Sequence, residues 1–401
     1  MTFWGYVRPN GEVGARNYVL IIPSYRIINI AAKRICDYVF GTRAIVTTGE
    51  VSRHTKDRER LARIFTGLAR NPNVYAVIIL GAKNDGSGYK EFLATRLTEE
   101  IGKSPKPVSV LTVEESGGLE RLVEDGIALA RQYVHDASLL RREPVPLSAL
   151  QVGVKCGFSD ATSGISGNPV FGLAADKLIG EGGTVLFSET TELIGAEQDV
   201  ASRCVDPKDA ARLLAMVEEI EEAAKRTGED IRQINPIPAN INAGISTLEE
   251  KSLGAIQKAG SMPIQGVLEY AQRPGKKGLH FMDGWASGYS LPVSLAAAGC
   301  QVTLYQLGGG DLPSNDPPVI ATNTGVVAPL MFVTGNPRTA KKAPRSIDFS
   351  SGAVLTGEET LEEAGEKLFN KIVSIAGGEL AKGETVNYMD PIEPYFLGPV
   401  F

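Results

Sequence analysis

Histidine is scarce in this sequence, with only His54, His135 and His280 among 401 residues. A mechanism built on histidine acids, bases or metal ligands therefore has very few candidates. The four cysteines, at positions 36, 156, 204 and 300, are widely spaced and form no CxxC pair. This spacing argues against a zinc site or a disulfide framework, and it is typical of reduced thiols, so we expect a cytoplasmic protein.

Long apolar runs and long basic runs are also missing. The longest apolar runs, such as residues 74–80, have the length of a strand, whereas a membrane span needs about 18 residues. Residues 1–8 lack the apolar core of a signal peptide. Because the net charge is −6 and the basic residues are dispersed, we expect neither a nucleic acid nor a membrane as a partner.

What is present is an ordinary globular composition, with 43% hydrophobic and 22% charged residues. A chain of this length predicts two or three domains. The charged, proline-rich segment 141–148 is our expected linker between an N-terminal α/β domain, residues 1–140, and a C-terminal domain, residues 149–401, that carries the main site motifs.

Apolar runs of strand length alternate with amphipathic helical segments along the chain. This alternation predicts an α/β fold of two domains, with mainly parallel sheets flanked by helices in Rossmann-like layers. We expect strands at residues 17–23, 43–48, 74–80, 107–112, 150–154, 183–187, 279–283, 301–306 and 330–334. We expect helices at residues 28–39, 56–68, 89–101, 117–139, 169–179, 210–226 and 361–376.

The loop at residues 155–169 is the most informative stretch. It combines Lys155, Cys156 and Asp160 with several serines, an asparagine and three glycines, directly after the expected strand 150–154. Polar, glycine-rich loops that leave a strand are where α/β proteins place ligand chemistry. The alternative is a long surface loop of turn residues. The side chains of Ser159, Ser163 and Asn168 complete this set of candidates.

Three carboxylates, Glu189, Glu192 and Glu197, follow the expected strand 183–187. Close carboxylates at the ligand edge of a sheet can bind a divalent cation, or act as an acid and a base. The alternative is the start of a helix, where acidic residues are favourable.

Segment 235–252 resembles a capping box that opens a helix, with Ser246 and Glu249 in the two capping positions. Capping leaves Asn240 and Lys251 unexplained, and these side chains could reach hydroxyl or carboxylate groups of a ligand.

Three further segments have weaker signals. Arg16 and Asn17 precede the first buried strand, and a guanidinium group can clamp a carboxylate. The alternative there is a β-turn at residues 9–11. The loop 81–88 is glycine-rich but fits no nucleotide motif, and the turn 307–311 is equally unspecific, so we expect no nucleotide cofactor.

Taken together, these motifs resemble the altronate/galactarate dehydratase family, which includes the large subunit of sulfolactate sulfo-lyase. The resemblance extends over nearly the whole chain, and Lys155-Cys-Gly-x-Ser-Asp-x-x-Ser-Gly-x-x-x-Asn-Pro169 is its most specific motif. The other matching segments are 5–17, 67–74, 189–197, 244–254, 333–339 and 398–400.

The resemblance implies a hydro-lyase that removes the α-proton beside a carboxylate of a sugar acid and then expels the β-hydroxyl. It also implies a divalent metal, Fe²⁺ or else Mn²⁺ or Mg²⁺. As partners we expect a second copy in a homodimer and a separate small subunit in place of the family's small N-terminal domain.

The resemblance implies a role in this chemistry for each candidate residue. The expected catalytic residues are Lys155, Cys156, Asp160, Glu189 and Lys251. The expected substrate-binding residues are Arg16, Asn17, Ser159, Ser163, Asn168, Asn240 and Glu250. The expected metal ligands are Glu189, Glu192 and Glu197.

The chain departs from the family pattern at places where family members carry cysteine. Ile27, the stretch 48–53 and the stretch 83–85 occupy three such places, and 321–325 replaces a Thr-Gly-Arg-Gly segment. Loss of thiols together is expected where they share a metal or a cluster. The alternatives to a sugar-acid hydro-lyase are therefore elimination from sulfolactate or a carboxylate-binding paralogue without catalysis.

Overall fold

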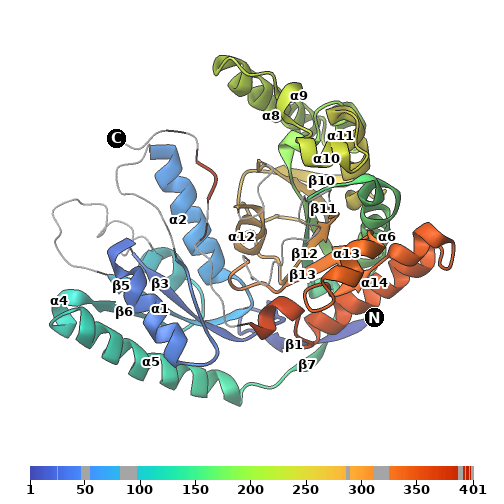
Figure 1. Cartoon of the computed structure of the whole chain (residues 1–401). Helices are drawn as coiled ribbons and strands as arrows, with labels where there is room; N and C mark the ends of the chain where they lie inside the picture. The colour runs from blue at the N-terminus through green and yellow to red at the C-terminus, as the bar shows by residue number, and fades with distance from the viewer. Residues whose placement is uncertain are drawn as a thin grey trace.

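The computed structural model describes residues 1–24, 26–46, 55–81, 97–285, 290–309 and 325–386, together with 392, 394–396 and 398. Figure 1 shows two lobes, each built on a sheet with helices packed on its faces. The two larger sheets are parallel throughout, with four and seven strands. This architecture confirms the expected α/β class of mainly parallel sheets flanked by helices.

The sheet of the N-terminal lobe has the order β4-β3-β5-β6. Its strands alternate their side chains between two apolar clusters, so that Val19 and Ile21 face one side and Leu20 and Ile22 face the other. Helices α1 and α5 cover the first side and α2 covers the second. The strands are β3 (Tyr18–Pro23), β4 (Thr42–Ala44), β5 (Val74–Gly81) and β6 (Val108–Thr112), and the helices are α1 (Asn29–Tyr38), α2 (Thr55–Arg70), α4 (Val113–Ser116) and α5 (Leu119–Leu139).

The sheet of the C-terminal lobe has the order β10-β11-β9-β8-β12-β13-β14. Its central strands are buried on both faces, as expected when helices cover each face of a parallel sheet. The strands are β8 (Gln151–Gly157), β9 (Thr184–Phe187), β10 (Ile264–Leu268), β11 (Gly278–Met282), β12 (Val302–Leu307), β13 (Leu330–Thr334) and β14 (Phe349–Ser350).

The helices of this lobe fall into three groups. Helices α6 (Asn168–Gly180) and α14 (Leu361–Ala376) lie side by side, and α12 (Ser290–Ala297) faces the N-terminal lobe (Figure 1). A further group extends away from the sheets at the top of Figure 1. It contains α8 (Pro207–Arg226), α9 (Ile231–Ile234), α10 (Pro238–Asn242) and α11 (Leu248–Ile256). The short helices α7 (Glu197–Ser202) and α13 (Pro337–Lys342) follow β9 and β13.

The segment 141–148, expected as a linker, contains a strand. In a small antiparallel sheet, β1 (Thr2–Val7) pairs with β2 (Val13–Gly14) on one side and with β7 (Glu143–Pro146) on the other. The first residues of the chain are thereby tied to the connection between the lobes. The sequence did not reveal this pairing because strand partners are set by tertiary contacts.

Helices α2 and α12 join the two lobes. Their approach is closest at Gly67, where a Cβ atom would lie 2.4 Å from the carbonyl oxygen of Ala297. Only a residue without a side chain fits at this distance, so Gly67 sets the spacing between the lobes.

We expect Gly67→Ala to lower the free energy of unfolding by about 1–3 kcal/mol, because an added methyl group overpacks a rigid contact. This reverses the usual benefit of alanine over glycine in a helix, about 1 kcal/mol. Gly180→Ala is the matched control, because a Cβ atom at this helical glycine meets nothing within 4 Å. Urea denaturation measures both variants, and equal stability of the two would contradict the close-packing argument.

Candidate functional site

The loop 155–169 and the carboxylates after β9 meet at one edge of the seven-stranded sheet. Strands β8 and β9 are parallel neighbours, so their carboxyl ends lie at the same edge. The backbone amide of Cys156, near the end of β8, donates a hydrogen bond to Glu189 Oε2 at 2.9 Å. Glu189 follows β9 directly, and this bond links the two strand ends.

A buried lysine, Lys258, lies at the centre of this edge. Its Nζ is 2.6 Å from Glu189 Oε2, 3.1 Å from Glu192 Oε2 and 3.3 Å from Cys156 Sγ. Cys156 Sγ in turn donates to Glu192 Oε2 at 2.9 Å. The second oxygen of Glu189, Oε1, is 3.3 Å from the Nζ of Lys155. We call Lys155, Cys156, Glu189, Glu192 and Lys258 the charged cluster.

The charged cluster is almost sealed from solvent, so its charges depend on one another. Burial alone would raise the pKa of Glu192, but Lys258 and Lys251 lower it to about 2. Burial would lower the pKa of Lys258, but the carboxylates of Glu189 and Glu192 raise it well above its usual value. Lys155 follows the same pattern, with Tyr305 and Glu189 as the groups that raise its pKa.

For the thiol of Cys156, the surroundings favour the uncharged form. Burial and the carboxylates of Glu189 and Glu192 raise its pKa well above the usual value, so the thiol is neutral at physiological pH. With Lys251 at the border, three ammonium groups face two carboxylates and a neutral thiol. These groups together carry one excess positive charge, and the wall of the neighbouring pocket adds the carboxylates of Asp160 and Glu250.

The backbone at Glu189 is strained. Its φ of 86° and ψ of 70° lie in the left-handed region, which a glutamate seldom adopts. Such a conformation costs about 1–3 kcal/mol and persists where the surroundings over-determine it. Here the Cys156 amide and Lys258 hold the carboxylate from two sides. The strain turns the side chain into the cluster.

A pocket of about 230 Å³ opens beside the charged cluster. Lys251, on α11, connects the two, because its Nζ lies 3.6 Å from Glu192 Oε1 and its side chain lines the pocket. The amide oxygen of Asn235 accepts a second bond from Lys251 at 2.9 Å. The pocket walls consist of Ser159, Asp160, Ala161, Ser163, Gly164, Ile165, Asn168, Ile245, Glu250, Lys251, Gly254 and Ala255.

Asp160, an expected catalytic residue, holds the loop in shape. Its Oδ1 accepts bonds from the Thr162 hydroxyl at 2.6 Å and the Ser163 amide at 3.1 Å. Its Oδ2 accepts a bond from Asn336 Nδ2 at 2.8 Å. Ser163 Oγ also accepts a bond from Gln306 at 3.2 Å. Asp160 therefore lines the pocket with both oxygens already engaged.

Asn168 and Ser159 present polar groups on the same wall. Asn168 Nδ2 donates to the Gly254 carbonyl at 3.0 Å, while its buried Oδ1 accepts no hydrogen bond from the described part of the chain. An unsatisfied buried acceptor is costly unless a ligand or water pairs with it. Asn168 Oδ1 is thus suited to accept a bond from a hydroxyl group in the pocket.

Asn240 and Glu250 surround the pocket in different ways. Asn240 donates to the Ser159 carbonyl at 2.8 Å, so it supports the loop from behind. Glu250 is exposed on the pocket rim, where its Oε2 accepts a bond from the Ser246 amide at 2.6 Å. The cap of α11 is Thr247, whose hydroxyl accepts a bond from the Glu250 amide, one residue later than the expected Ser246.

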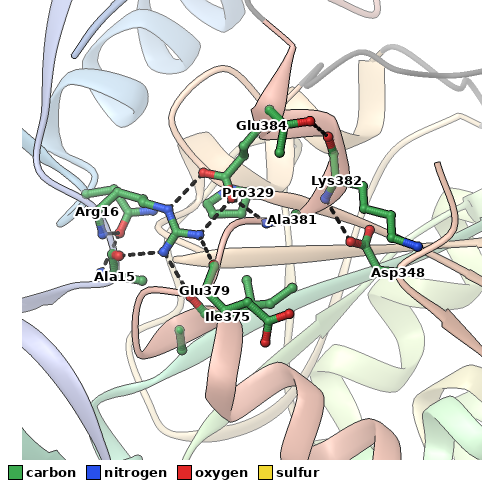
Figure 2. Close-up of polar contacts among 12 residues, drawn as sticks. Ala15, Arg16, Pro329, Asp348, Ile375, Glu379, Ala381, Lys382 and Glu384 are labelled. Carbon is green, nitrogen blue, oxygen red and sulfur yellow. Dashed lines mark hydrogen bonds and ion pairs between the residues drawn. The ribbon is translucent and has the colours of Figure 1, made fainter. Parts of the chain in front are cut away.

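Arg16 and Asn17 lie away from the pocket. The Arg16 guanidinium donates two bonds to Glu384, at 2.7 and 2.8 Å, and three to the carbonyls of Ala15, Ile375 and Glu379. Figure 2 shows Arg16 directed at Glu384 and the end of α14. All five of its donors are engaged. Arg16 fastens the N-terminal segment to the C-terminal part of the chain, which departs from its expected role as a substrate clamp.

Asn17 has a similar structural position. Its Oδ1 accepts a bond from Arg8 at 2.7 Å, and its Nδ2 donates to the Ala137 carbonyl at 2.7 Å. Like Arg16, it departs from the substrate-binding role expected from the sequence, because its partners are fixed within the fold.

The Arg16–Glu384 pair predicts a specific acid sensitivity. Burial alone would raise the pKa of Glu384, but hydrogen bonds and charge from Arg16 lower it below 4.5. The Glu384 carboxylate therefore binds a proton more readily in the unfolded chain than in the folded one. The stability that the Arg16–Glu384 pair contributes is complete above pH 4.5 and is lost as the pH falls through the pKa of Glu384 in the folded protein. Unfolding free energies measured from pH 6 downward should decline more steeply in the wild type than in Glu384→Gln, and parallel curves would contradict this.

The residues that could hold a metal ion are Cys156, Glu189 and Glu192, whose ligand atoms lie within 4.8 Å of one another. Glu197, the third expected metal ligand, instead begins α7 and bonds the Gly195 amide at 2.5 Å. Thiol and carboxylate donors suit a divalent transition metal. The ammonium group of Lys258, however, already contacts all three ligands. With this lysine in place, the three residues do not fit a metal ion in addition.

Sequence reasoning missed Lys258 and Tyr305. Lys258 follows Lys251 by two helical turns, so both fall on one face of α11 and its 3₁₀ extension Gln257–Ala259. That spacing was a signal that the sequence offered. Tyr305, on β12, places its ring 4.5 Å from Lys155 Nζ, a cation–π contact that depends on strand order.

Several segments named from the sequence fall wholly or partly outside the described residues. These are the loop 81–88 beyond Gly81, the turn 307–311 beyond Gly309, and the family-pattern departures at 48–53, 83–85 and 321–324. The expected helix 89–101 before residue 97, the expected strand 43–48 beyond residue 46 and the matching segment 398–400 beyond residue 398 also lie outside them. Within the described ranges, no helix combines the length and the apolar content that a membrane crossing requires.

Comparisons with known proteins match nearly the whole chain. Residues 147–395 match the model of the D-galactarate/altronate dehydratase C-terminal domain, and residues 5–138 match the second domain of D-galactarate dehydratase/altronate hydrolase. The (2R)-sulfolactate sulfo-lyase subunit beta of Chromohalobacter salexigens is 34% identical, over 97% of this chain and 96% of its own.

Two further relatives are longer than this chain. The altronate dehydratase of Bacillus subtilis is 30% identical, over 97% of this chain and 76% of its own. The galactarate dehydratase (L-threo-forming) of Escherichia coli is 32% identical, over 79% of this chain and 59% of its own.

Proposed function

The chain belongs to the D-galactarate/altronate dehydratase family, and from this premise we propose that it is a hydro-lyase. It would remove water from a sugar acid or a related small hydroxy-carboxylate and release a 2-oxo acid. The observation that carries this proposal is the position of Lys251, whose ammonium group lines a polar pocket and borders the charged cluster, where two lysines balance two glutamates.

The electrostatics of the cluster match the first step of such a reaction. Loss of the α-proton places negative charge on the substrate carboxylate, which becomes an enediolate. Preorganised cations near this group stabilise it more strongly than the ground state, because charge grows there in the transition state. Lys251 lines the pocket, and behind it Lys155 and Lys258 are each paired with carboxylates of the charged cluster.

Glu250 and Lys251 are proposed as the proton acceptor and donor. Both side chains line the pocket. The carboxylate of Glu250, exposed at the pocket rim, is proposed to accept the α-proton. The ammonium group of Lys251 can protonate the departing hydroxyl. Asn168 Oδ1 is proposed to accept a bond from a substrate hydroxyl, and the remaining site residues are proposed to position these groups.

A metal has no step in this proposal. The family resemblance implies Fe²⁺, or else Mn²⁺ or Mg²⁺, and a thiol ligand would favour Fe²⁺ over Mg²⁺. Lys258 holds the ligand atoms of the candidate group instead.

A second candidate function is elimination of sulfite from a sulfonated hydroxy acid. Similarity to the relatives favours it, because the chain is 34% identical to the sulfo-lyase subunit and 30% identical to the altronate dehydratase of Bacillus subtilis. The same pocket chemistry applies, with sulfite as the leaving group. That relative is named a subunit, so we propose that a separate small subunit also joins this chain.

We propose a cytoplasmic location, on the ground that all four cysteines are free thiols. A homodimer is proposed from the family resemblance alone. Size-exclusion chromatography with light scattering measures the oligomer, and co-purification from the native host reveals a small subunit.

The direct test incubates the purified protein with altronate, galactarate and sulfolactate. Formation of 2-oxo acid is followed as the semicarbazone, and sulfite by its reaction with a disulfide reagent. Reactions in D₂O are followed by NMR for exchange of the α-proton. The proposal predicts 2-oxo acid from at least one substrate, and sulfite identifies the second candidate. Binding without product or exchange, with and without Fe²⁺, would instead indicate a carboxylate-binding paralogue.

A further inference from the structure

Lys258 is coordinated as a metal ion would be. Its side chain is 2% exposed, and its three N–H donors match three acceptors, namely Cys156 Sγ, Glu189 Oε2 and Glu192 Oε2. These acceptors come from the same three residues whose ligand atoms lie within 4.8 Å of one another. The ammonium nitrogen thus stands at the common centre of the candidate ligand set.

We propose that Lys258 is a built-in cation that takes the place of a metal ion, and that removing its ammonium group turns Cys156, Glu189 and Glu192 into a metal site. The inference concerns the occupant of this group and does not rest on the proposed reaction. Its readout is metal binding, so the two proposals fail separately.

Space excludes a lysine and a metal together. A bound zinc-like ion lies about 2.0–2.3 Å from oxygen and sulfur ligands, at the centre of the group they form. The Lys258 nitrogen lies only 2.6–3.3 Å from those atoms, so it occupies the same volume. Lys258 is buried, so its ammonium group does not reach solvent.

Charge leads to the same conclusion. Lys155 Nζ is 3.3 Å from Glu189 Oε1 and Lys251 Nζ is 3.6 Å from Glu192 Oε1, so each carboxylate already faces a second cation. A divalent ion added to three ammonium groups would greatly increase the excess positive charge of a buried site. Without Lys258, two carboxylates and a thiol would face two more distant ammonium groups, and a cation could enter.

The test uses Co²⁺, whose bond to a cysteine sulfur gives a charge-transfer absorption band. The wild type, Cys156→Ser, Lys258→Met and the double variant Lys258→Met/Cys156→Ser are titrated with Co²⁺ under anaerobic conditions. Methionine keeps most of the lysine volume and removes its charge. We expect no Cys156-dependent band in the wild type, a saturable band in Lys258→Met, and loss of that band in the double variant.

Two results would overturn the proposal. One is a wild-type band that Cys156→Ser removes, because it shows metal at the group with Lys258 present. The other is a folded Lys258→Met protein without a band. Lys258→Gln serves as the second variant if Lys258→Met does not fold. The comparison of the wild type with Cys156→Ser tests whether a metal binds with Lys258 present, and it does so whether or not Lys258→Met and Lys258→Gln fold. Binding at any other place is identified by its independence of Cys156.

A stability measurement gives a second readout. A ligand that binds only the folded state raises the unfolding free energy with its concentration. Co²⁺ should therefore raise the unfolding midpoint of Lys258→Met and leave that of Lys258→Met/Cys156→Ser nearly unchanged.

Discussion

Replacing Lys251 by methionine is expected to lower kcat/KM for 2-oxo acid formation by about 10²–10⁴-fold, the usual contribution of a positioned acid or base. Lys251 is the one lysine that lines the described pocket, and it lies 3.6 Å from Glu192 Oε1 in the charged cluster. Its loss removes the ammonium group closest to the substrate while the buried pair of Lys258 with the glutamates stays intact. Steady-state kinetics on the substrate found by the functional test measure the effect.

The matched control for this variant is Lys225→Met. Lys225 lies on α8 and pairs with Glu222 at 2.8 Å on an exposed surface, so its loss removes the same charge from a residue that does not line the pocket. Its kinetics should equal those of the wild type. The proposed role of Lys251 fails if Lys251→Met keeps more than about a tenth of the wild-type kcat/KM, since a positioned acid contributes far more than that.

Replacing Lys258 by methionine is expected to lower the free energy of unfolding by about 3–5 kcal/mol, the typical result of breaking a buried ion pair from one side. Glu189 and Glu192 are 0% and 3% exposed, so they lose their closest cation without gaining water. Each then keeps only one ammonium group, at 3.3 and 3.6 Å. Urea denaturation in metal-free buffer measures the loss.

The double variant Lys258→Met/Glu189→Gln separates charge from packing. If the cost comes from the uncompensated carboxylates, removing one of them should restore part of the stability, because a neutral amide is less costly to bury. An equal or greater loss in the double variant would show that Lys258 acts through its packing. Lys225→Met again serves as the exposed control, with no measurable change expected.

Local sequence patterns determined the secondary structure closely. The helix expected at 361–376 coincides with α14 because its apolar spacing is regular and Thr360 with Glu363 forms a capping box. Apolar runs predicted the buried strands to within a few residues, since strands covered on both faces have few polar positions. Strands β1, β2, β7, β10 and β14 were missed, and for β1 and β7 the reason is that their pairing joins distant parts of the chain.

The residues of the candidate site were likewise predictable from the sequence only in part. The loop 155–169 and the carboxylates 189 and 192 were identifiable because they combine reactive side chains at strand ends, and parallel strands bring such ends together. Glu197 was indistinguishable from them in sequence, although in the fold it only begins a short helix.

By itself, the sequence determined the α/β class, the positions of most strands and helices, the family, and the loop that forms one wall of the pocket. Only the tertiary structure decided which charges meet. Arg16 has its partner in Glu384, near the opposite end of the chain, and Lys258 pairs with Glu189 and Glu192, two of the three residues expected to hold a metal. The physical reason is that two charged groups pair when they lie within a few ångströms of each other in space. The separation of two residues along the chain does not predict that distance.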